Sequence, residues 1–444
     1  MQTQVIENES RVGSPPHTIV VSTTRIARSL ARVARREYGL VLLASGAFAL
    51  RFADDSFVQP QPGTSAGDHL ASGLVPIAVL AGVVATYPRL RAGVRVLIAM
   101  TLGALGITFG APGVYHLLHG DTSGADYTGL LAIVAAGVLL VLGPVTLWKA
   151  RRTDGSRRRR YVRRSLLVAA TPILALAAFW FVVFPIGLGY VYTHTAPAAS
   201  TPDVGVPSQR VTVTTSDSLD LAAWYVPSKN RAAVIVFPGP ARAKEARVLI
   251  RLGYGALLLE PRGQGASEGD PVRWAGDRDL LAGLEFLQHR ADVDRARIGA
   301  IGFSVGGEIL LEAAAQSNGF KAVVSEGAGS RVGDEDISGA ARVLTEPNLA
   351  LMTAAVTLFG NHGPPPPIVD RIERIAPRPL FLIYADPGAG GESSRQPKYL
   401  AAAGRPKAIW KVPGARHTGG IDAAPAEYEQ RVVAFLDSAL LGNG

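Results

Sequence analysis

The 444-residue chain contains no cysteine, and several long apolar runs near its start contain almost no charged residue. The absence of cysteine excludes disulfide bonds and thiol chemistry, and it suits a domain that folds outside the cytoplasm without oxidative help. The long apolar runs of the first 194 residues are nearly free of Asp, Glu, Lys and Arg. Charge inside a membrane span marks a relay or a transport path, so these runs give no sign of either.

Five apolar segments in residues 1–194 are candidates for membrane spans. They are approximately Tyr38–Ala53, Leu70–Tyr87, Val96–Leu118, Tyr127–Trp148 and Ser165–Val191. A helix needs about 20 residues to cross the hydrocarbon core. The first segment is shorter than this and carries Arg51 near its end, so it needs independent support. The sequence predicts an all-α transmembrane bundle of about five helices over residues 1–194.

The distribution of charge supports five spans. Arginine clusters precede the first segment, separate the second from the third, and separate the fourth from the fifth, whereas the other connections carry aspartate. With five spans every basic loop lies on the same side, as the positive-inside rule requires. We therefore expect a multi-pass plasma-membrane protein with a cytoplasmic N-terminus and an extracytoplasmic C-terminal domain.

The net charge of +9 also belongs to this region, where 19 Lys and Arg face 9 Asp and Glu. The arginine run 157–160 lies between two apolar segments, which favours an orientation signal or contact with anionic lipid over nucleic-acid binding. The lipid bilayer is thus an expected partner and nucleic acid is not. The pattern leaves the oligomeric state open.

Residues 195–209 contain several prolines and predict an extended linker. Over residues 210–444 a hairpin pattern is followed by short apolar runs that alternate with helical patterns. This alternation predicts an α/β fold with a doubly wound, mostly parallel sheet. A lid-like insertion at about 327–378 interrupts the pattern and contains an apolar helix at about Ala341–Phe359.

The pentapeptide Gly302-Phe303-Ser304-Val305-Gly306 lies between a strand-like run and a helix-like run. A serine on a sharp strand-to-helix turn needs small residues two positions to either side, because larger side chains would collide with the strand and the helix. The motif in this setting predicts a nucleophile elbow with Ser304 as the nucleophile.

The C-terminal region resembles the α/β-hydrolase family in the order of its motifs. These are Phe237-Pro238-Gly239, the run from Pro261 to Ser267, the Ser304 elbow, and Gly414-Ala415-Arg416-His417. The stretch Arg262–Gly269 and the helix Asp277–Arg290 are similar to the dienelactone-hydrolase and serine-peptidase-like branch. The resemblance implies a Ser-His-acid triad that works without a cofactor.

A serine hydroxyl needs a base within hydrogen-bonding reach, and four histidines of the linker and hydrolase region are candidates. His194 lies at the linker, His289 at the polar end of a helix, and His362 in the insertion. His417 follows a strand-like run and a glycine turn near the C-terminus, where the family places its base. We expect His417 to be the general base.

The acid that orients His417 has two candidates, Asp386 and Glu392, which both follow the strand-like run Leu380–Tyr384. Asp386 lies just beyond the strand, where it also suits a turn before Pro387. Glu392 follows a flexible glycine-rich stretch that allows it to swing back under the imidazole. The sequence slightly favours Glu392 and leaves both open.

The developing oxyanion needs amide donors. Val305, which follows the nucleophile, is the first candidate, and Gly239 or Ala241 is the second, because Pro240 has no N–H. The glycines from Gly263 to Gly269 match neither nucleotide-binding fingerprint. His116 and His119 are too few for a metal site. No cofactor or metal is expected.

These features predict hydrolysis of an ester or thioester of a small-molecule acyl substrate. An extracytoplasmic peptidase is the enzymatic alternative, because related branches cleave peptides. A non-catalytic scaffold of the same fold is the other alternative, and Pro240 encourages it. In the insertion, Leu349, Leu351, Met352 and Leu358 are candidates to line an acyl pocket, with ordinary helix packing as an equal interpretation.

Overall fold

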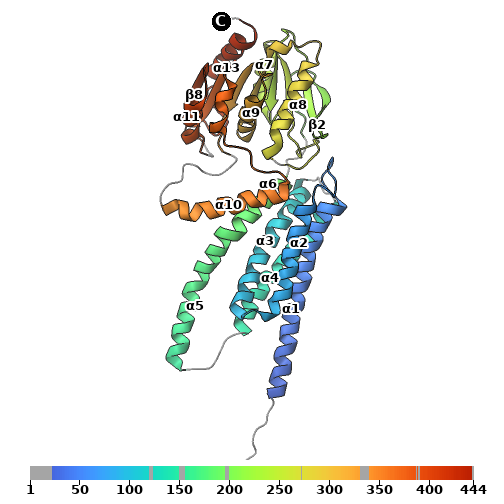
Figure 1. The fold of residues 1–444 in the computed structure, drawn as a ribbon, viewed down its shortest axis with the longest axis vertical. Coiled ribbons are helices and arrows are strands. Elements are labelled where there is room, and N and C mark those ends of the chain that lie inside the picture. The colour runs from blue at the N-terminus through green and yellow to red at the C-terminus, as the bar shows by residue number, and fades with distance from the viewer. Residues whose placement is uncertain are drawn as a thin grey trace, which may run out of the picture.

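The computed structural model describes residues 23–119, 124–149, 156–195, 200–271, 273–330, 340–386, 388 and 391–442. They form two parts: an N-terminal bundle of helices and, stacked on one end of it, a C-terminal α/β domain (Figure 1). Residues 196–199 of the predicted linker, 331–339 of the predicted insertion, and Arg151 and Arg152 of the basic loop lie outside the described residues.

In the part of the chain that the structure describes, the bundle contains six α-helices in chain order. They are α1 (Thr23–Ala53), α2 (Leu70–Thr86), α3 (Ala92–His119), α4 (Gly124–Lys149), α5 (Arg157–Ala178) and α6 (Phe184–His194). A π-helical turn, Phe179–Val183 (η3), joins α5 directly to α6, and another, Asp54–Val58 (η1), continues α1. The fifth apolar segment of the sequence is therefore a single interrupted helical pass.

Glycines on α3 let its backbone approach α4 closely. A Cβ on Gly110 would lie 2.5 Å from the carbonyl oxygen of Gly129, and a Cβ on Gly113 would lie 2.8 Å from that of Asp126. Further along, Gly143 of α4 meets the other half of α3 at Met100, so the two helices run antiparallel. Such close contacts of small residues are a common way of packing helices inside a membrane.

Five helices of the described chain are long and apolar enough to cross a membrane. Four belong to the bundle: Leu70–Arg89, Ala92–His119, Asp126–Lys149 and Ala169–His194. The fifth, Arg342–Gly360, is the helix of the insertion. The first predicted span is not among them, because the apolar half of α1 is flanked by Arg36 and Glu37 and contains Arg51. It still packs within the bundle core through Phe48 and Phe52.

The described residues of the α/β domain form an eight-stranded sheet with the order β1-β2-β4-β3-β5-β6-β7-β8. The strands are β1 (Gln209–Thr214), β2 (Asp220–Val226), β3 (Ala233–Phe237), β4 (Gly255–Leu259), β5 (Ile298–Phe303), β6 (Ala322–Glu326), β7 (Leu380–Asp386) and β8 (Lys407–Pro413). β2 pairs antiparallel with β1 and β4, and all other pairs are parallel. The predicted fold class is confirmed.

Helices cover both faces of the sheet. They are α7 (Ala243–Arg251), α8 (Gly276–Gln288), α9 (Val305–Gln316), α11 (Glu392–Ala402), the short α12 (Gly420–Ala423) and α13 (Pro425–Leu440). Leu280 of α8 and Leu310 of α9 pack on one face, and Leu249 of α7 and Leu436 of α13 pack on the other. The central strands are buried on both sides, which accounts for their continuous apolar sequence.

The insertion helix α10 (Ala340–Gly360) leaves the α/β domain and packs on the bundle. Its Phe359 is buried in the bundle core with Phe52 and Tyr190, and Ala355 contacts Gly189 of α6. Figure 1 shows α10 lying crosswise over the end of the bundle, between it and the α/β domain. The two parts therefore share a core helix as well as a linker.

Candidate active site

Ser304 occupies the turn between β5 and α9 with a backbone φ of 54°. A left-handed conformation at a residue other than glycine is costly and persists where the surroundings impose it. A Cβ on Gly302 would lie 2.5 Å from the carbonyl oxygen of Gly306, and a Cβ on Gly306 would lie 2.6 Å from that of Phe237. Both glycines of the motif are therefore required by close backbone contacts, as the sequence predicted.

His417 lies between Ser304 and Glu392. Its Nε2 is 2.8 Å from Ser304 Oγ, and its Nδ1 is 2.8 Å from Glu392 Oε1. A carboxylate at Nδ1 requires the proton there, which leaves Nε2 free to accept the serine proton. The Glu392 side chain is fully buried, whereas that of His417 is 31% exposed. This arrangement can activate a serine hydroxyl.

The structure distinguishes the two candidate carboxylates by position. Asp386, at the end of β7, pairs with Lys411 Nζ at 2.6 Å on the surface. Glu392 begins α11, and its Oε2 also accepts a bond of 3.1 Å from the Ala385 N–H. The helix N-terminus favours a carboxylate at this point. Glu392, and not Asp386, is therefore the acid brought to His417.

The two predicted oxyanion donors differ in availability. Val305 is the first residue of α9, where an N–H has no intrahelical acceptor. The N–H of Gly239, in contrast, donates to the carbonyl of Leu259 at 2.8 Å, and a Cβ on Gly239 would lie 2.3 Å from the Leu258 backbone. Gly239 holds its loop against β4, which corrects the expectation that its amide faces the oxyanion. Pro240 opens the next turn, Pro240–Arg242.

Two residues that the sequence did not single out as site residues hold the His417 loop. Arg242 donates to the carbonyl and the hydroxyl of Thr418 at 3.1 and 2.7 Å, and its guanidinium lies over the Phe303 ring. Glu326, at the end of β6, accepts from the N–H of Gly420 at 2.9 Å and from Tyr428 Oη at 2.8 Å. Burial raises the pKa of Glu326 despite these bonds.

A cavity of about 200 Å³ adjoins Ser304. Its lining is Phe237, Pro238, Pro261, Arg262, Gln264, Pro271, Gly276, Asp279, Phe303, Ser304, Val305, Gly306 and Ile309. Arg262 contacts Asp279 at 2.7 Å and Asp217 at 2.9 Å, so both charges that line the cavity are paired. Burial raises the pKa of Asp279 to about 6. No residue of α10 lines this cavity, and Leu358 packs against the bundle core instead.

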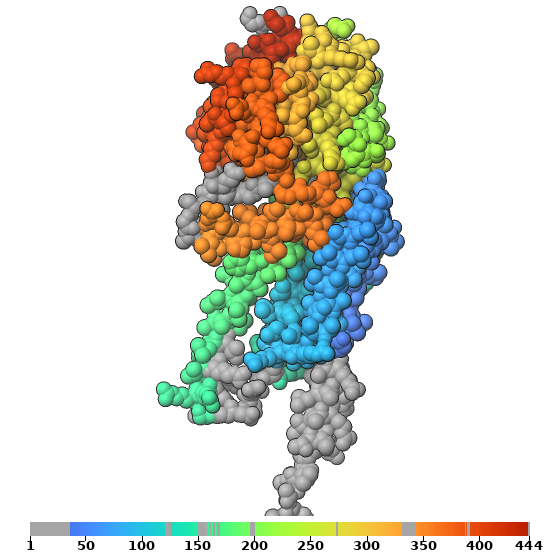
Figure 2. Space-filling model, in the orientation of Figure 1, coloured from blue at the N-terminus to red at the C-terminus, as the bar shows by residue number. Residues whose placement is uncertain are grey.

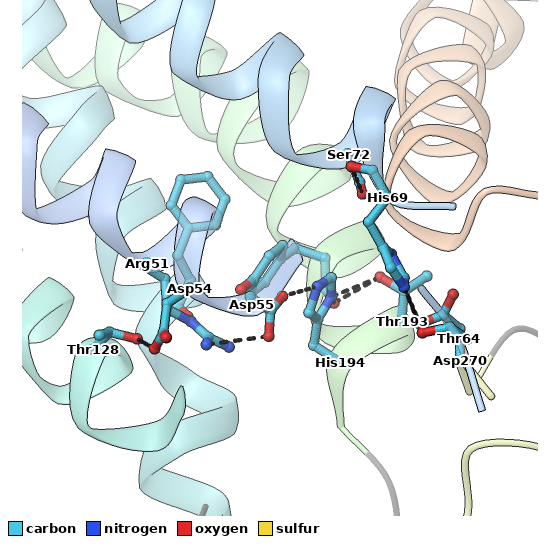
Figure 3. A network of polar contacts seen from close by, with 12 residues as sticks. Arg51, Asp54, Asp55, Thr64, His69, Ser72, Thr128, Thr193, His194 and Asp270 are labelled. Carbon is cyan, nitrogen blue, oxygen red and sulfur yellow. Dashed lines mark hydrogen bonds and ion pairs between the residues drawn. The ribbon is translucent and has the colours of Figure 1, made fainter. Parts of the chain in front are cut away.

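The loop that lines the cavity also rests on the bundle. The N–H of Gly269 donates to the carbonyl of Pro62 at 2.7 Å. Beside this contact, His69 Nε2 is 4.0 Å from Asp270 Oδ1 and 2.8 Å from the Thr64 hydroxyl (Figure 3). The carboxyl edge of the sheet, where Ser304 lies, therefore faces the helical bundle.

A buried polar cluster continues from this contact into the bundle (Figure 3). Asp55 bonds His194 Nε2 at 2.7 Å and Arg51 at 3.2 Å, and Asp54 accepts from the Thr128 hydroxyl at 2.8 Å. His194, which the sequence analysis placed at the linker, is the last residue of α6 and is paired with Asp55. No sequence motif marks these contacts, since their members come from distant segments.

The remaining histidines stay apart from Ser304. His289 and His362 contact backbone carbonyls at 2.8 and 2.9 Å, and His116 contacts Asp126 at 2.9 Å. Among the described residues, no group of three or more His, Asp or Glu side chains is placed to hold a metal ion.

The comparison with protein families decides the classification. Residues 192–423 match the model of the X-Pro dipeptidyl-peptidase (S15 family). The chain belongs to this family. This S15-family chain is therefore a hydrolase by class, which agrees with the α/β-hydrolase architecture and the Ser304 elbow.

Individual relatives of this S15-family chain are distant. The uncharacterized protein Rv2307c of Mycobacterium tuberculosis is 29% identical over 250 residues, covering 51% of this chain and 78% of its own. Uncharacterized protein YfhR of Escherichia coli strain K12 is 23% identical, covering 52% and 82%. Among solved structures, the α/β hydrolase GrgF of a Penicillium species is 20% identical with a TM-score of 0.44, covering 53% of this chain and 100% of that one.

Proposed function

We propose that the protein is a membrane-anchored serine hydrolase that cleaves an ester or thioester, with its hydrolase domain outside the cytoplasm. The observation that carries the proposal is the unbroken series from Glu392 through His417 to Ser304, with both contacts at 2.8 Å. Three side chains from separate segments meet with the bonding pattern that makes serine a nucleophile.

In the first half-reaction Ser304 Oγ attacks the acyl carbon while His417 Nε2 takes the hydroxyl proton. Glu392 keeps the imidazole oriented and stabilises the imidazolium that forms. The N–H of Val305 donates to the oxyanion, and the N–H of Ala241 is the candidate for the second donor. The tetrahedral intermediate collapses, the alcohol or thiol leaves with the proton from His417, and an acyl group remains on Ser304.

In the second half-reaction water takes the place of the leaving group. His417 accepts one proton of the water as its oxygen attacks the acyl carbon. Collapse of this second intermediate releases the carboxylic acid and returns the proton to Ser304. No cofactor enters either step, and each proton moves through the same imidazole nitrogen.

Peptide cleavage is the second candidate, and membership of the S15 family is the observation that favours it. An enzyme that removes dipeptides needs a group that recognises the substrate's terminal ammonium. Among the described residues that line the cavity, the carboxylate is Asp279, and it is bonded to Arg262 at 2.7 Å. The paired charge favours an uncharged acyl group, so we place the ester or thioester first.

The test is covalent labelling of membranes that contain the full chain with a fluorophosphonate probe. We expect wild type to be labelled and both Ser304→Ala and His417→Ala to lose labelling. A folded wild type that resists the probe would favour the non-catalytic scaffold. Parallel assays with p-nitrophenyl esters and with X-Pro anilides separate the two enzymatic candidates.

A further inference from the structure

Helix α10 is apolar over most of its length. Its charged residues, Arg342 and Glu346, pair with each other near its start, and residues 347–360 contain no Asp, Glu, Lys or Arg. The segment Arg342–Gly360 is long and apolar enough to cross a membrane. A helix of this composition is costly to expose to water.

Among the described residues, the buried side chains of α10 lie on one side of the helix. Asn348, Ala355 and Phe359 are buried against η3 and α6, at the spacing of one helical stripe. Val343 and Leu344, in contrast, are 73% and 55% exposed. Figure 2 shows α10 as an exposed band between the bundle and the α/β domain.

The exposed part of α10 is continuous with the outer surface of the bundle. The indole of Trp180, in η3, donates to the carbonyl of Leu344 at 3.0 Å. Around it, Leu176 and Phe179 are 68% and 49% exposed on the pass that forms one side of the bundle. Trp180 lies within the apolar pass Ala169–His194, one helical turn after Leu176. The same bilayer that covers Leu176 would therefore reach Val343 and Leu344.

The active site lies on the side of the α/β domain that faces the bundle and α10. The insertion begins beside the triad, because a Cβ on Gly327 would lie 3.1 Å from His417 Cε1. On the other side of Ser304, the loop that lines the cavity sits on the bundle through Gly269 and Pro62. Both walls of the site thus lead to the bundle and α10.

The size of the cavity limits what it encloses. About 200 Å³ is little more than the roughly 150 Å³ of a cavity that binds benzene. A long acyl chain would therefore extend beyond the cavity, toward the bundle and the bilayer around it. A lipid substrate could keep most of its chain in the membrane while its ester reaches Ser304.

We propose that α10 lies in the plane of the extracytoplasmic leaflet, with Val343 and Leu344 in lipid, and that the substrate is a membrane-resident acyl ester or thioester that approaches Ser304 from the bilayer. The first part of the proposal concerns the position of α10 in the bilayer. The second half rests on the proposed hydrolase function and names its substrate class.

The position of α10 can be tested with a single fluorophore, because the chain has no cysteine. Val343→Cys and, as a control, Lys229→Cys in the exposed β2–β3 loop are labelled with bimane in the full chain. Each is reconstituted in phosphatidylcholine vesicles whose acyl chains carry a nitroxide near the headgroup. We expect strong quenching at position 343 and none at 229. Absence of quenching at position 343 would overturn the proposal. This is the result expected if a second copy of the chain, and not lipid, covers Val343.

The substrate class is tested by comparing two esters. The full chain in vesicles is given p-nitrophenyl palmitate dispersed in the bilayer and water-soluble p-nitrophenyl acetate. In the double variant Val343→Asp, Leu344→Asp, we expect the ratio of the palmitate rate to the acetate rate to fall about tenfold, because two apolar anchors are replaced by charges. The control Leu252→Asp, at the exposed residue that directly follows α7, should keep the wild-type ratio.

An unchanged ratio in the double variant would overturn the assignment of a membrane-resident substrate. Failure of the hydrolase function itself has a different signature, in which wild type cleaves neither ester and resists fluorophosphonate. The quenching result at position 343 does not depend on catalysis and stands in either case.

Discussion

Arg242 reaches from the loop after β3 to Thr418, the residue that follows His417, the proposed base, and donates to both Thr418 oxygens at 3.1 and 2.7 Å. Thr418 has a backbone φ of 53°, a conformation that its surroundings must hold in place. The same arginine therefore links the turn that contains Pro240 to the loop that presents the imidazole. Its role is to position His417, since the triad contacts themselves are made without it.

Replacing Arg242 with Met should slow acylation without abolishing it. The His417 loop would lose two hydrogen bonds, and misplacement of a catalytic group by about 1 Å can cost roughly a hundredfold in rate. We expect a lower kcat with little change in KM, measured on p-nitrophenyl acetate. Arg247→Met, which removes a surface pair with Asp203, is the matched control. Equal rates for Arg242→Met and wild type would refute the positioning role.

Asp386, at the end of β7, and Glu392, at the start of α11, should respond differently to removal of their charge. Glu392→Gln keeps the shape of the side chain but offers His417 the wrong partner, so we expect turnover to fall about 10³- to 10⁴-fold. Asp386→Asn removes only a surface pair with Lys411 and should stay within about twofold of wild type. Single-turnover rates of ester cleavage measure both. A large loss in Asp386→Asn with an active Glu392→Gln would reverse the assignment of the acid.

The Glu326 carboxyl should make stability depend on pH. Burial raises its pKa above the ordinary value of 4.5, so the native state holds a proton that the unfolded state has released. The stabilisation is complete below pH 4.5 and is lost as the pH rises through the native pKa. We expect the Tm of Glu326→Gln, relative to wild type, to increase between pH 4.5 and neutrality. Glu285→Gln, on the exposed face of α8, should follow wild type throughout, and a parallel course for Glu326→Gln would contradict the prediction.

The stability of the bundle should be sensitive to loss of the buried Asp55 carboxylate, which contacts Arg51 and His194. Asp55→Asn leaves Arg51 and His194 without their carboxylate, and removing one member of a buried ion pair typically costs about 3–5 kcal/mol. Thermal unfolding of the full chain in detergent measures the effect. Asp68→Asn, on an exposed turn next to Ser65, supplies the comparison, and we expect it to cost about 1 kcal/mol or less. Equal midpoints for the two variants would argue against a structural role for the pair.

The proposed orientation predicts which positions a membrane-impermeant maleimide can reach. In cells with an intact membrane, Lys229→Cys in the hydrolase domain should be labelled at once. Arg91→Cys, between α2 and α3, should be labelled only after permeabilisation. The parent chain supplies the blank, because it has no thiol. The opposite pattern would invert the topology.

Local motifs made part of the site predictable from the sequence. Ser304 directly follows β5, and His417 follows β8 after a short turn, so short-range patterns and chain order were enough to place them. Glu392 could not be separated from Asp386 because the answer depends on the path of the intervening loop, where Gly388 and Gly391 adopt positive φ angles of 66° and 75°. Glycine permits many backbone conformations, so the residue types alone do not fix such a path.

The placement of α10 could not be predicted from the sequence, for a different reason. An apolar stretch of this length suits a lid, a membrane span or a helix lying across the bundle. These three structures differ only in the residues that the helix contacts. The aromatic contact of Phe359 with Phe52 and Tyr190 joins residues from three remote parts of the chain. The corrected role of Gly239 is of the same kind, since its partner Leu259 lies on another strand.

The burial of Phe359 among bundle residues means that the polypeptide passes between the two parts three times: once after α6, once before α10 and once after it. The α/β domain is therefore joined to the helical bundle by three chain segments and not by one. A protease that cuts only within residues 200–208 should release nothing, and the two fragments should migrate together until a detergent harsh enough to dissolve the aromatic core separates them.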